Sequence, residues 1–247
     1  MDLSIYNKLN FERPPVAVKF LFKKPENIQR LNKKLALCEM IREAQQENAP
    51  FYFDKENEDC FGKFMLGMAE QTGPPRLMAQ IGIKYQIFQE PRANRRIQEC
   101  NPTFPKGLVN YVVFSPLDKL TFNPDLLILT ATPSQAEVVL RATTYSTGTL
   151  FEAKHSIVGA CSWLFIHPFK SGKVNYVVTG LSFGMKAKQV FPEGLILIAI
   201  PYDWIPTVTQ NLKEMKWDLP AYTMGREWHV KERNRILKEL AQELQSI

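Results

Sequence analysis

Short apolar segments, alternating with stretches of helical spacing, constrain the fold of this 247-residue chain more than any other feature. Runs of β-branched and aliphatic residues between turn residues predict strands. We expect them at residues 16–22, 51–53, 109–114, 126–129, 174–179 and 195–200. Apolar positions with a helical period predict helices at residues 2–10, 25–47, 60–70, 91–100, 132–144, 203–216 and 225–245, and a further one from Ser156 to the turn at 168–172. The pattern predicts an α/β or α+β fold, one domain over residues 1–247 with a mixed central β-sheet flanked by helices.

The bulk composition is that of an ordinary globular protein, with 45% hydrophobic and 23% charged residues. The N-terminus shows no apolar signal segment, and the longest apolar runs fall far short of the roughly 20 residues that cross a bilayer. We therefore expect a cytoplasmic protein without membrane contact. Basic clusters such as Arg92, Arg95 and Arg96 are compatible with a phosphate or acidic partner, but block-like basicity is absent and no nucleic-acid partner is indicated.

Four cysteines, Cys38, Cys60, Cys100 and Cys161, lie far apart and form no CxxC pair. Compact zinc-finger and ferredoxin signatures are thereby excluded, and a cytoplasmic compartment argues against a disulfide framework. We expect Cys38 on the inward face of its helix, Cys60 at a helix start and Cys161 within a helix. Three converging thiolates would form a soft site for zinc, copper(I) or an iron–sulfur cluster. The alternative is that each cysteine is buried as a small hydrophobic residue.

Other signals leave several readings open, and no local signature decides whether the chain is an enzyme. Neither GxGxxG, GxxxxGK[ST] nor GxSxG occurs, so a standard dinucleotide fold, a P-loop and a serine hydrolase are not indicated. His155 precedes Cys161 and suggests a cysteine-nucleophile enzyme using Cys60 or Cys161. The glycine-punctuated turn at 179–184 and the late aromatics suggest instead a pocket of a non-catalytic small-molecule binding protein.

Several segments together resemble an uncharacterised prokaryotic family, the DUF169 proteins. The matching segments, in chain order, are Pro14-Pro15-Val16-Ala17-Val18, Cys38, Cys60-Phe61-Gly62 followed by Gly67, Pro133-Ser134-Gln135, Cys161, and the glycine turn before Pro192-Glu193-Gly194. They run from residue 14 to about residue 215, and their order and spacing are more specific than any one of them.

The resemblance implies which residues to consider for a site. It points to Cys38, Cys60 and Cys161 as metal ligands. Members often carry Cys-x-Gly-x-Arg where this chain has Ser182, Gly184 and Lys186. These three residues are therefore the predicted cofactor-binding turn, and an iron–sulfur cluster or zinc is the predicted cofactor. Because Ser182 replaces the cysteine, a four-thiolate site is put in doubt. One alternative is a three-thiolate site in which Ser182, water or a ligand occupies the fourth position. The other is that this chain has lost the metal and kept the scaffold.

Overall fold

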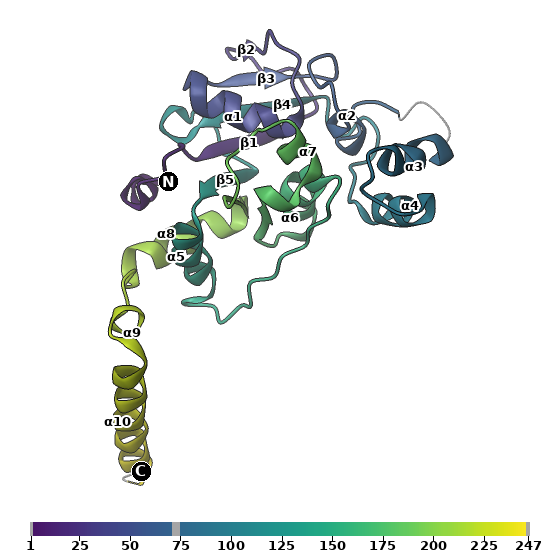
Figure 1. Ribbon diagram of the computed structural model, residues 1–247. Coiled ribbons are helices and arrows are strands. Elements are labelled where there is room, and N and C mark those ends of the chain that lie inside the picture. The colour runs from purple at the N-terminus through teal and green to yellow at the C-terminus, as the bar shows by residue number, and fades with distance from the viewer. Residues whose placement is uncertain (1, 71–74, 246–247) are drawn as a thin grey trace. The chain divides into compact units, whose positions relative to one another are not determined.

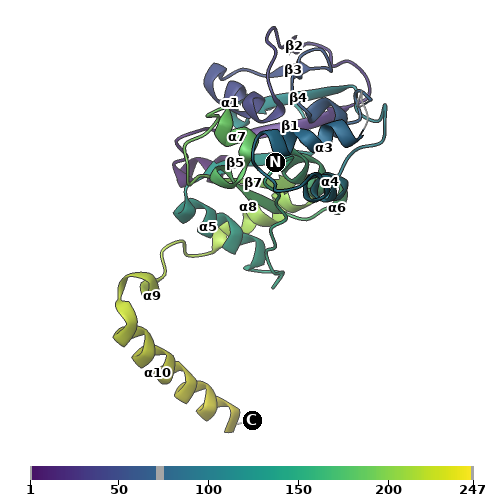
Figure 2. The same cartoon turned by 45° about the vertical axis from the view of Figure 1, so that its right-hand side comes forward.

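The computed structural model describes residues 2–70 and 75–245, which divide into two compact units. The larger unit extends to Lys213 and the smaller one begins at Glu214. In the larger unit a seven-stranded sheet has the order β2-β3-β4-β1-β5-β7-β6 (Figures 1 and 2). The strands are β1 (Val16–Leu21), β2 (Gln29–Arg30), β3 (Phe51–Phe53), β4 (Tyr111–Pro116), β5 (Leu126–Ala131), β6 (Asn175–Val178) and β7 (Ile196–Pro201). β2 and β3 pair in parallel and the other neighbours are antiparallel, so the predicted mixed sheet is confirmed.

The helices flank this sheet, as the sequence predicts. The α-helices are α1 (Leu37–Glu47), α2 (Gly62–Met65), α3 (Pro75–Lys84), α4 (Pro91–Cys100), α5 (Pro133–Thr144), α6 (His167–Ser171), α7 (Phe183–Ala187) and α8 (Ile205–Glu214). Shorter 3₁₀ turns are η1 (Ser4–Leu9), η2 (Leu117–Lys119), η4 (Thr179–Leu181) and η5 (Tyr202–Trp204), and η3 (Ser162–Ile166) is a π-helical turn continuous with α6. α5 starts as expected, because Thr132 and Gln135 form a capping box.

Side chains alternate between the two faces of each strand, and each face is covered by different helices. On one face, Leu126 and Ile128 of β5 belong to a core that also contains Cys38 and Ile41 of α1 and residues of η3. Leu127 and Leu129 point to the opposite face and are fully buried there, where α5 contacts β5 and β7. The segments that carry Cys38 and Cys161 thus cover the same face of the sheet.

Two predicted helices differ from the structure in ways that move a cysteine. The helix predicted over residues 25–47 begins only at Leu37, because the preceding segment forms β2 and then an irregular stretch. There the amide of Asn57 donates to the carbonyls of Leu31 and Lys33, which removes those carbonyls from a helical ladder. Cys38 therefore lies in the first turn of α1 instead of its middle.

The helix predicted from Ser156 was also placed too early. The Ser156 hydroxyl donates to Asn101 and to the carbonyl of Val158 instead of capping a helix. The helical stretch begins at Ala160–Cys161 and continues through η3 and α6. The helix predicted over residues 60–70 is reduced to the single turn of α2, which starts two residues after Cys60.

The smaller unit consists of α9 (Pro220–Thr223) and α10 (Gly225–Gln245). The predicted bounds of the long C-terminal helix are confirmed. None of its described residues is buried, although its sequence suggests a docking face. No helix among residues 2–70 and 75–245 combines the length and the apolar character needed to span a bilayer.

Candidate functional site: a cluster of three thiols

Cys38, Cys60 and Cys161 come together from three separate segments of the chain. The three side chains lie near enough to change one another's pKa, and Cys161 has the largest effect on the pKa of Cys38. All three are free thiols that belong to or pack against the same core. The fourth cysteine, Cys100, is an exposed residue at the end of α4. The three predicted cysteines thus lie in or against one core, and Cys100 lies outside it.

Lys188 is the cationic group of this cluster, and the sequence analysis missed it. Its Nζ atom lies 3.8 Å from Cys60 Sγ. α7 brings it there, since Lys188 is the first residue beyond that helix and α7 lies beside α1 (Figures 1 and 2). Burial lowers the pKa of Lys188, but the attraction of Cys60, Cys38, Glu39 and Cys161 outweighs this effect and the net shift is upward.

The pKa values of the three thiols are shifted in different directions, because burial, the neighbouring thiols and the charge of Lys188 act on each thiol to a different extent. The neighbouring Cys161 thiol, assisted by Lys188, lowers the pKa of Cys38 against the opposing effect of burial. The Cys38 thiol, together with burial, raises the pKa of Cys161 well above that of a free thiol. Burial also raises the pKa of Cys60, although Lys188 acts in the opposite direction. Among these three thiols, only Cys38 has a lowered pKa.

A buried carboxylate, Glu58, holds two of the cysteine segments in place. It is only 1% exposed. Its Oε1 atom accepts a hydrogen bond from the backbone N–H of Leu37, and its Oε2 atom accepts from those of Cys60 and Lys63. Burial raises the pKa of Glu58, while these N–H donors pull it down. One side chain thereby connects the residue before Cys38 with Cys60 itself.

Gly62 and Gly67, the two glycines that follow Cys60 in the family-like motif, lie so close to neighbouring atoms that a side chain would not fit at either position. A Cβ atom on Gly62 would lie 2.6 Å from Glu58 Oε1, so a side chain there would displace the carboxylate. Gly67 has a φ angle of +70°, and its Cβ would lie 2.3 Å from the carbonyl oxygen of Pro105. Both glycines therefore have a local packing role at the start of the Cys60 segment.

The predicted cofactor-binding turn consists of a short 3₁₀ turn followed directly by the start of a helix. Thr179–Leu181 is a 3₁₀ turn, and Ser182 is the N-cap of α7, which contains Gly184. Ser182 is buried, whereas Lys186 is exposed and its Nζ pairs at 2.8 Å with Glu193. A role of Ser182, Gly184 and Lys186 in cofactor binding stays a prediction.

The thiols do not form a finished coordination sphere. Within the described part of the chain, no three His, Cys, Asp or Glu side chains are arranged so that they could hold a metal ion. A zinc–sulfur bond is about 2.3 Å long, so three thiolates that share one tetrahedral ion must lie within about 4 Å of one another. Cys60, in the loop before α2, and Cys161 are partly exposed, whereas Cys38 is buried.

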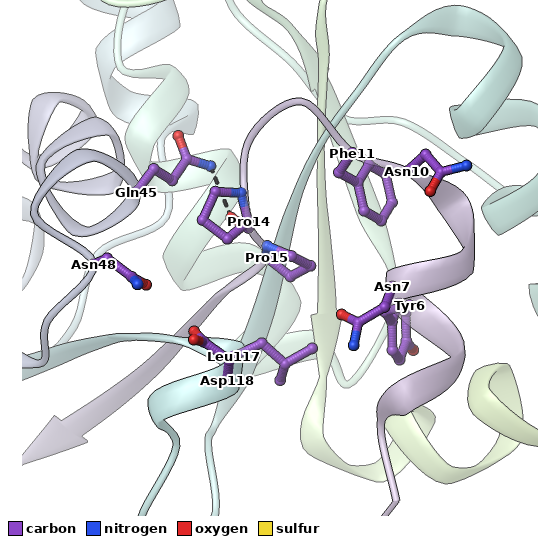
Figure 3. Close-up of a pocket in the computed structure, with 10 residues that line it drawn as sticks. All are labelled: Tyr6, Asn7, Asn10, Phe11, Pro14, Pro15, Gln45, Asn48, Leu117 and Asp118. Carbon is purple, nitrogen blue, oxygen red and sulfur yellow. Dashed lines mark hydrogen bonds between the residues drawn. The ribbon is translucent and has the colours of Figure 1, made fainter.

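The geometry gives less support to a catalytic pair of His155 with a cysteine and to a binding pocket at the 179–184 turn. His155 Nδ1 lies 3.1 Å from the carbonyl oxygen of Ser156, and Nε2 lies 3.3 Å from that of Val178, so both ring nitrogens face backbone. This places the ring away from the role of a base for Cys161. A pocket of about 610 Å³ lies beside η1 and the end of α1, where Gln45 Nε2 donates to the Pro14 carbonyl (Figure 3). Neither the 179–184 turn nor the late aromatics line that pocket.

Comparison with known proteins agrees with the motifs. The chain is 22% identical over 209 residues to the uncharacterized protein MJ0308 of Methanocaldococcus jannaschii, a match that covers 83% of this chain and 89% of that protein. No solved structure matches the chain significantly. The model of the family DUF169, described as "Uncharacterised ArCR", matches residues 4–211. The chain therefore belongs to the DUF169 family.

Proposed function

We propose that this protein binds a soft metal ion or an iron–sulfur cluster through Cys38, Cys60 and Cys161. The observation that carries the proposal is the convergence of three free thiols from α1, the loop before α2 and the start of the η3 stretch. Thiolate sulfur prefers zinc, copper(I) and iron–sulfur clusters over hard ions. A bound metal favours dissociation of each thiol, so Cys161 can serve as a ligand although its pKa is raised in the free chain, and binding should then strengthen as the pH rises.

Lys188 supports this role by its charge. Three thiolates around a divalent ion carry a net negative charge, and an ammonium group 3.8 Å from one sulfur reduces the cost of bringing them together. With three protein ligands, the fourth position is left to Ser182, water or an external ligand. An open position of this kind permits redox or Lewis-acid chemistry at a bound metal.

Anaerobic purification followed by elemental analysis tests the proposal. We expect stoichiometric zinc, copper or iron in the wild-type chain, with a brown visible chromophore if iron and sulfide are present. Cys60→Ser should lower the metal content several-fold, whereas Cys100→Ser, which changes an exposed cysteine outside the cluster, should leave it unchanged. Equal metal content in both variants, or none in the wild-type chain after anaerobic reconstitution, would refute the proposal.

A second function is favoured by one observation, the contact between Lys188 and the partly exposed Cys60. A cation beside a thiol stabilises the thiolate, which is the nucleophilic form, and Lys188 thereby offsets part of the effect of burial, which raises the pKa of Cys60. We propose Cys60 as the nucleophile of a thiol enzyme if the metal assay is negative. Stoichiometric alkylation of Cys60 by iodoacetamide should then be much faster than that of Cys100, and Lys188→Met should remove most of the difference.

A further inference from the structure

α3 and α4 pack against each other as a helical hairpin, and a second pocket lies beside α4 (Figures 1 and 2). Its volume of about 590 Å³ is in the range of small-molecule binding sites. The described residues that line it are Phe88, Glu90, Arg92, Ala93, Arg96 and Ile97. None of them belongs to the thiol cluster, so this pocket is a separate feature of the chain.

The apolar part of the pocket is held in place by Gly82 of α3. The backbone N–H groups of Ile87 and Phe88 donate to the Gly82 carbonyl at 2.9 and 3.4 Å. A Cβ atom on Gly82 would lie 2.6 Å from Asn94 Nδ2 and 2.7 Å from Phe88 Cδ2, so α3 meets both α4 and the Phe88 ring at close range. Asn94 is only 1% exposed. The half-buried Phe88 ring is therefore packed against the hairpin and forms a built wall of the pocket.

The charged part of the pocket consists of two arginines and one glutamate. Arg92 and Arg96 are four residues apart on α4, a spacing at which the Cβ atoms of two helical residues are about 5–6 Å apart. Both are exposed, and within residues 2–70 and 75–245 neither forms an ion pair with Glu90 or any other carboxylate. Like charges at this spacing repel each other, and a bound anion would relieve that repulsion.

We propose that this pocket binds a small organic phosphate monoester that carries a flat ring. A phosphate group has a charge of about −1.5 to −2 at pH 7 and three terminal oxygens, so it can accept hydrogen bonds from both guanidinium groups at once. A carboxylate has one negative charge and would leave one arginine without a counter-ion. The ring lies against the apolar lining, which consists of Phe88, Ala93 and Ile97. Nucleoside monophosphates have both of these parts.

Isothermal titration calorimetry of the full chain with adenosine monophosphate and with phenyl phosphate tests this proposal. We expect at least one of the two probes to bind at a single saturable site. Adenosine and inorganic phosphate should bind much more weakly than that probe, because each lacks one of the two parts. Arg92→Gln and Arg96→Gln should each weaken binding by about tenfold, which is the effect of losing one charge-assisted hydrogen bond. Arg95→Gln is the matched control, since it removes the same charge from the same helix but does not line the pocket, and its affinity should stay within about twofold of the wild type.

Several outcomes would overturn the proposal. One is that neither probe binds saturably at concentrations up to about 1 mM. Another is an equal loss of affinity in all three arginine variants, which would indicate a general attraction of anions to a basic chain. Inorganic phosphate that binds as tightly as the better probe would show that the flat ring plays no part. Because the lining residues and the thiol cluster share no residue, these outcomes do not depend on whether the chain binds a metal.

Discussion

Replacing Glu58 with glutamine tests whether this carboxylate holds the cysteine segments in place. The side chain accepts three backbone hydrogen bonds, and glutamine of the same size has one acceptor oxygen. The best amide orientation keeps the two bonds to Cys60 and Lys63 and leaves the N–H of Leu37 facing an NH₂ group. One unsatisfied buried N–H costs about 1–3 kcal/mol, and the loss of charge weakens each remaining bond by about 1 kcal/mol. Relief of the buried charge offsets part of this, so we expect about 2–4 kcal/mol of destabilisation.

Urea unfolding of the reduced, metal-free chain measures this difference. Glu56→Gln is the matched control, because Glu56 lies in the same loop and its side chain is 68% exposed. We expect the control to stay within about 0.5 kcal/mol of the wild type. A second readout is thiol labelling under native conditions, in which Cys38 and Cys60 should both react faster in Glu58→Gln. Equal free energies of unfolding for the two variants, with unchanged labelling, would show that the carboxylate has no such role.

Two further predictions concern the scaffold. Burial raises the pKa of Tyr6 to about 12, so its contribution to stability is complete below the unfolded-state pKa of about 10 and declines as the pH rises through 12. Between about pH 9 and about pH 11, urea unfolding should show the wild type losing about 1 kcal/mol more than Tyr6→Phe, and parallel pH profiles would contradict this. Gly62→Ala should destabilise the chain by about 1–3 kcal/mol in the same assay, because the added Cβ would collide with Glu58. Gly180→Ala, with nothing within 4 Å of its Cβ, is the control, and an equal effect of both would contradict the steric explanation.

The sheet was predictable because its signal is local. The strands around Val18, Phe114, Ile128 and Ile198 are short apolar runs whose ends are marked by turn residues, and each was found within a few residues of its expected place. The helical spacing of Leu31 and residues nearby was misleading. That spacing continues smoothly into α1, but long-range hydrogen bonds from Asn57 and pairing with β3 hold the chain extended before Leu37.

The sequence predicts which three cysteines to consider for the site, but it does not predict the residues that surround them. The family-like motifs identified Cys38, Cys60 and Cys161. Lys188 carries no local signal, since it is one lysine of a basic chain and reaches the cluster only through the course of α7. Glu58 has a weak signal, because an acidic residue shortly before Cys60-Phe61-Gly62 is well placed to accept backbone N–H groups at the start of α2. The sequence does not show that Glu58 is buried, because its burial depends on how α1 packs against that loop.

The late start of α1 changes the chemistry expected of the cluster. Within the predicted helix at 25–47, Cys38 would lie in the middle, where backbone N–H groups are already paired. In the structure it is the second residue of α1, and Cys161 is the second residue of the helical stretch that begins at Ala160. The first turn of a helix has free N–H groups and the positive end of the macrodipole, which stabilise a nearby thiolate. Of the two, only Cys38 has a lowered pKa, because the neighbouring Cys38 thiol and burial raise the pKa of Cys161. The pKa of Cys60 is raised by burial, although Lys188 Nζ lies 3.8 Å from its sulfur and acts in the opposite direction. The fold therefore favours the anionic form at Cys38, whereas Cys60 and Cys161 would need the charge of a bound metal to lose their protons readily.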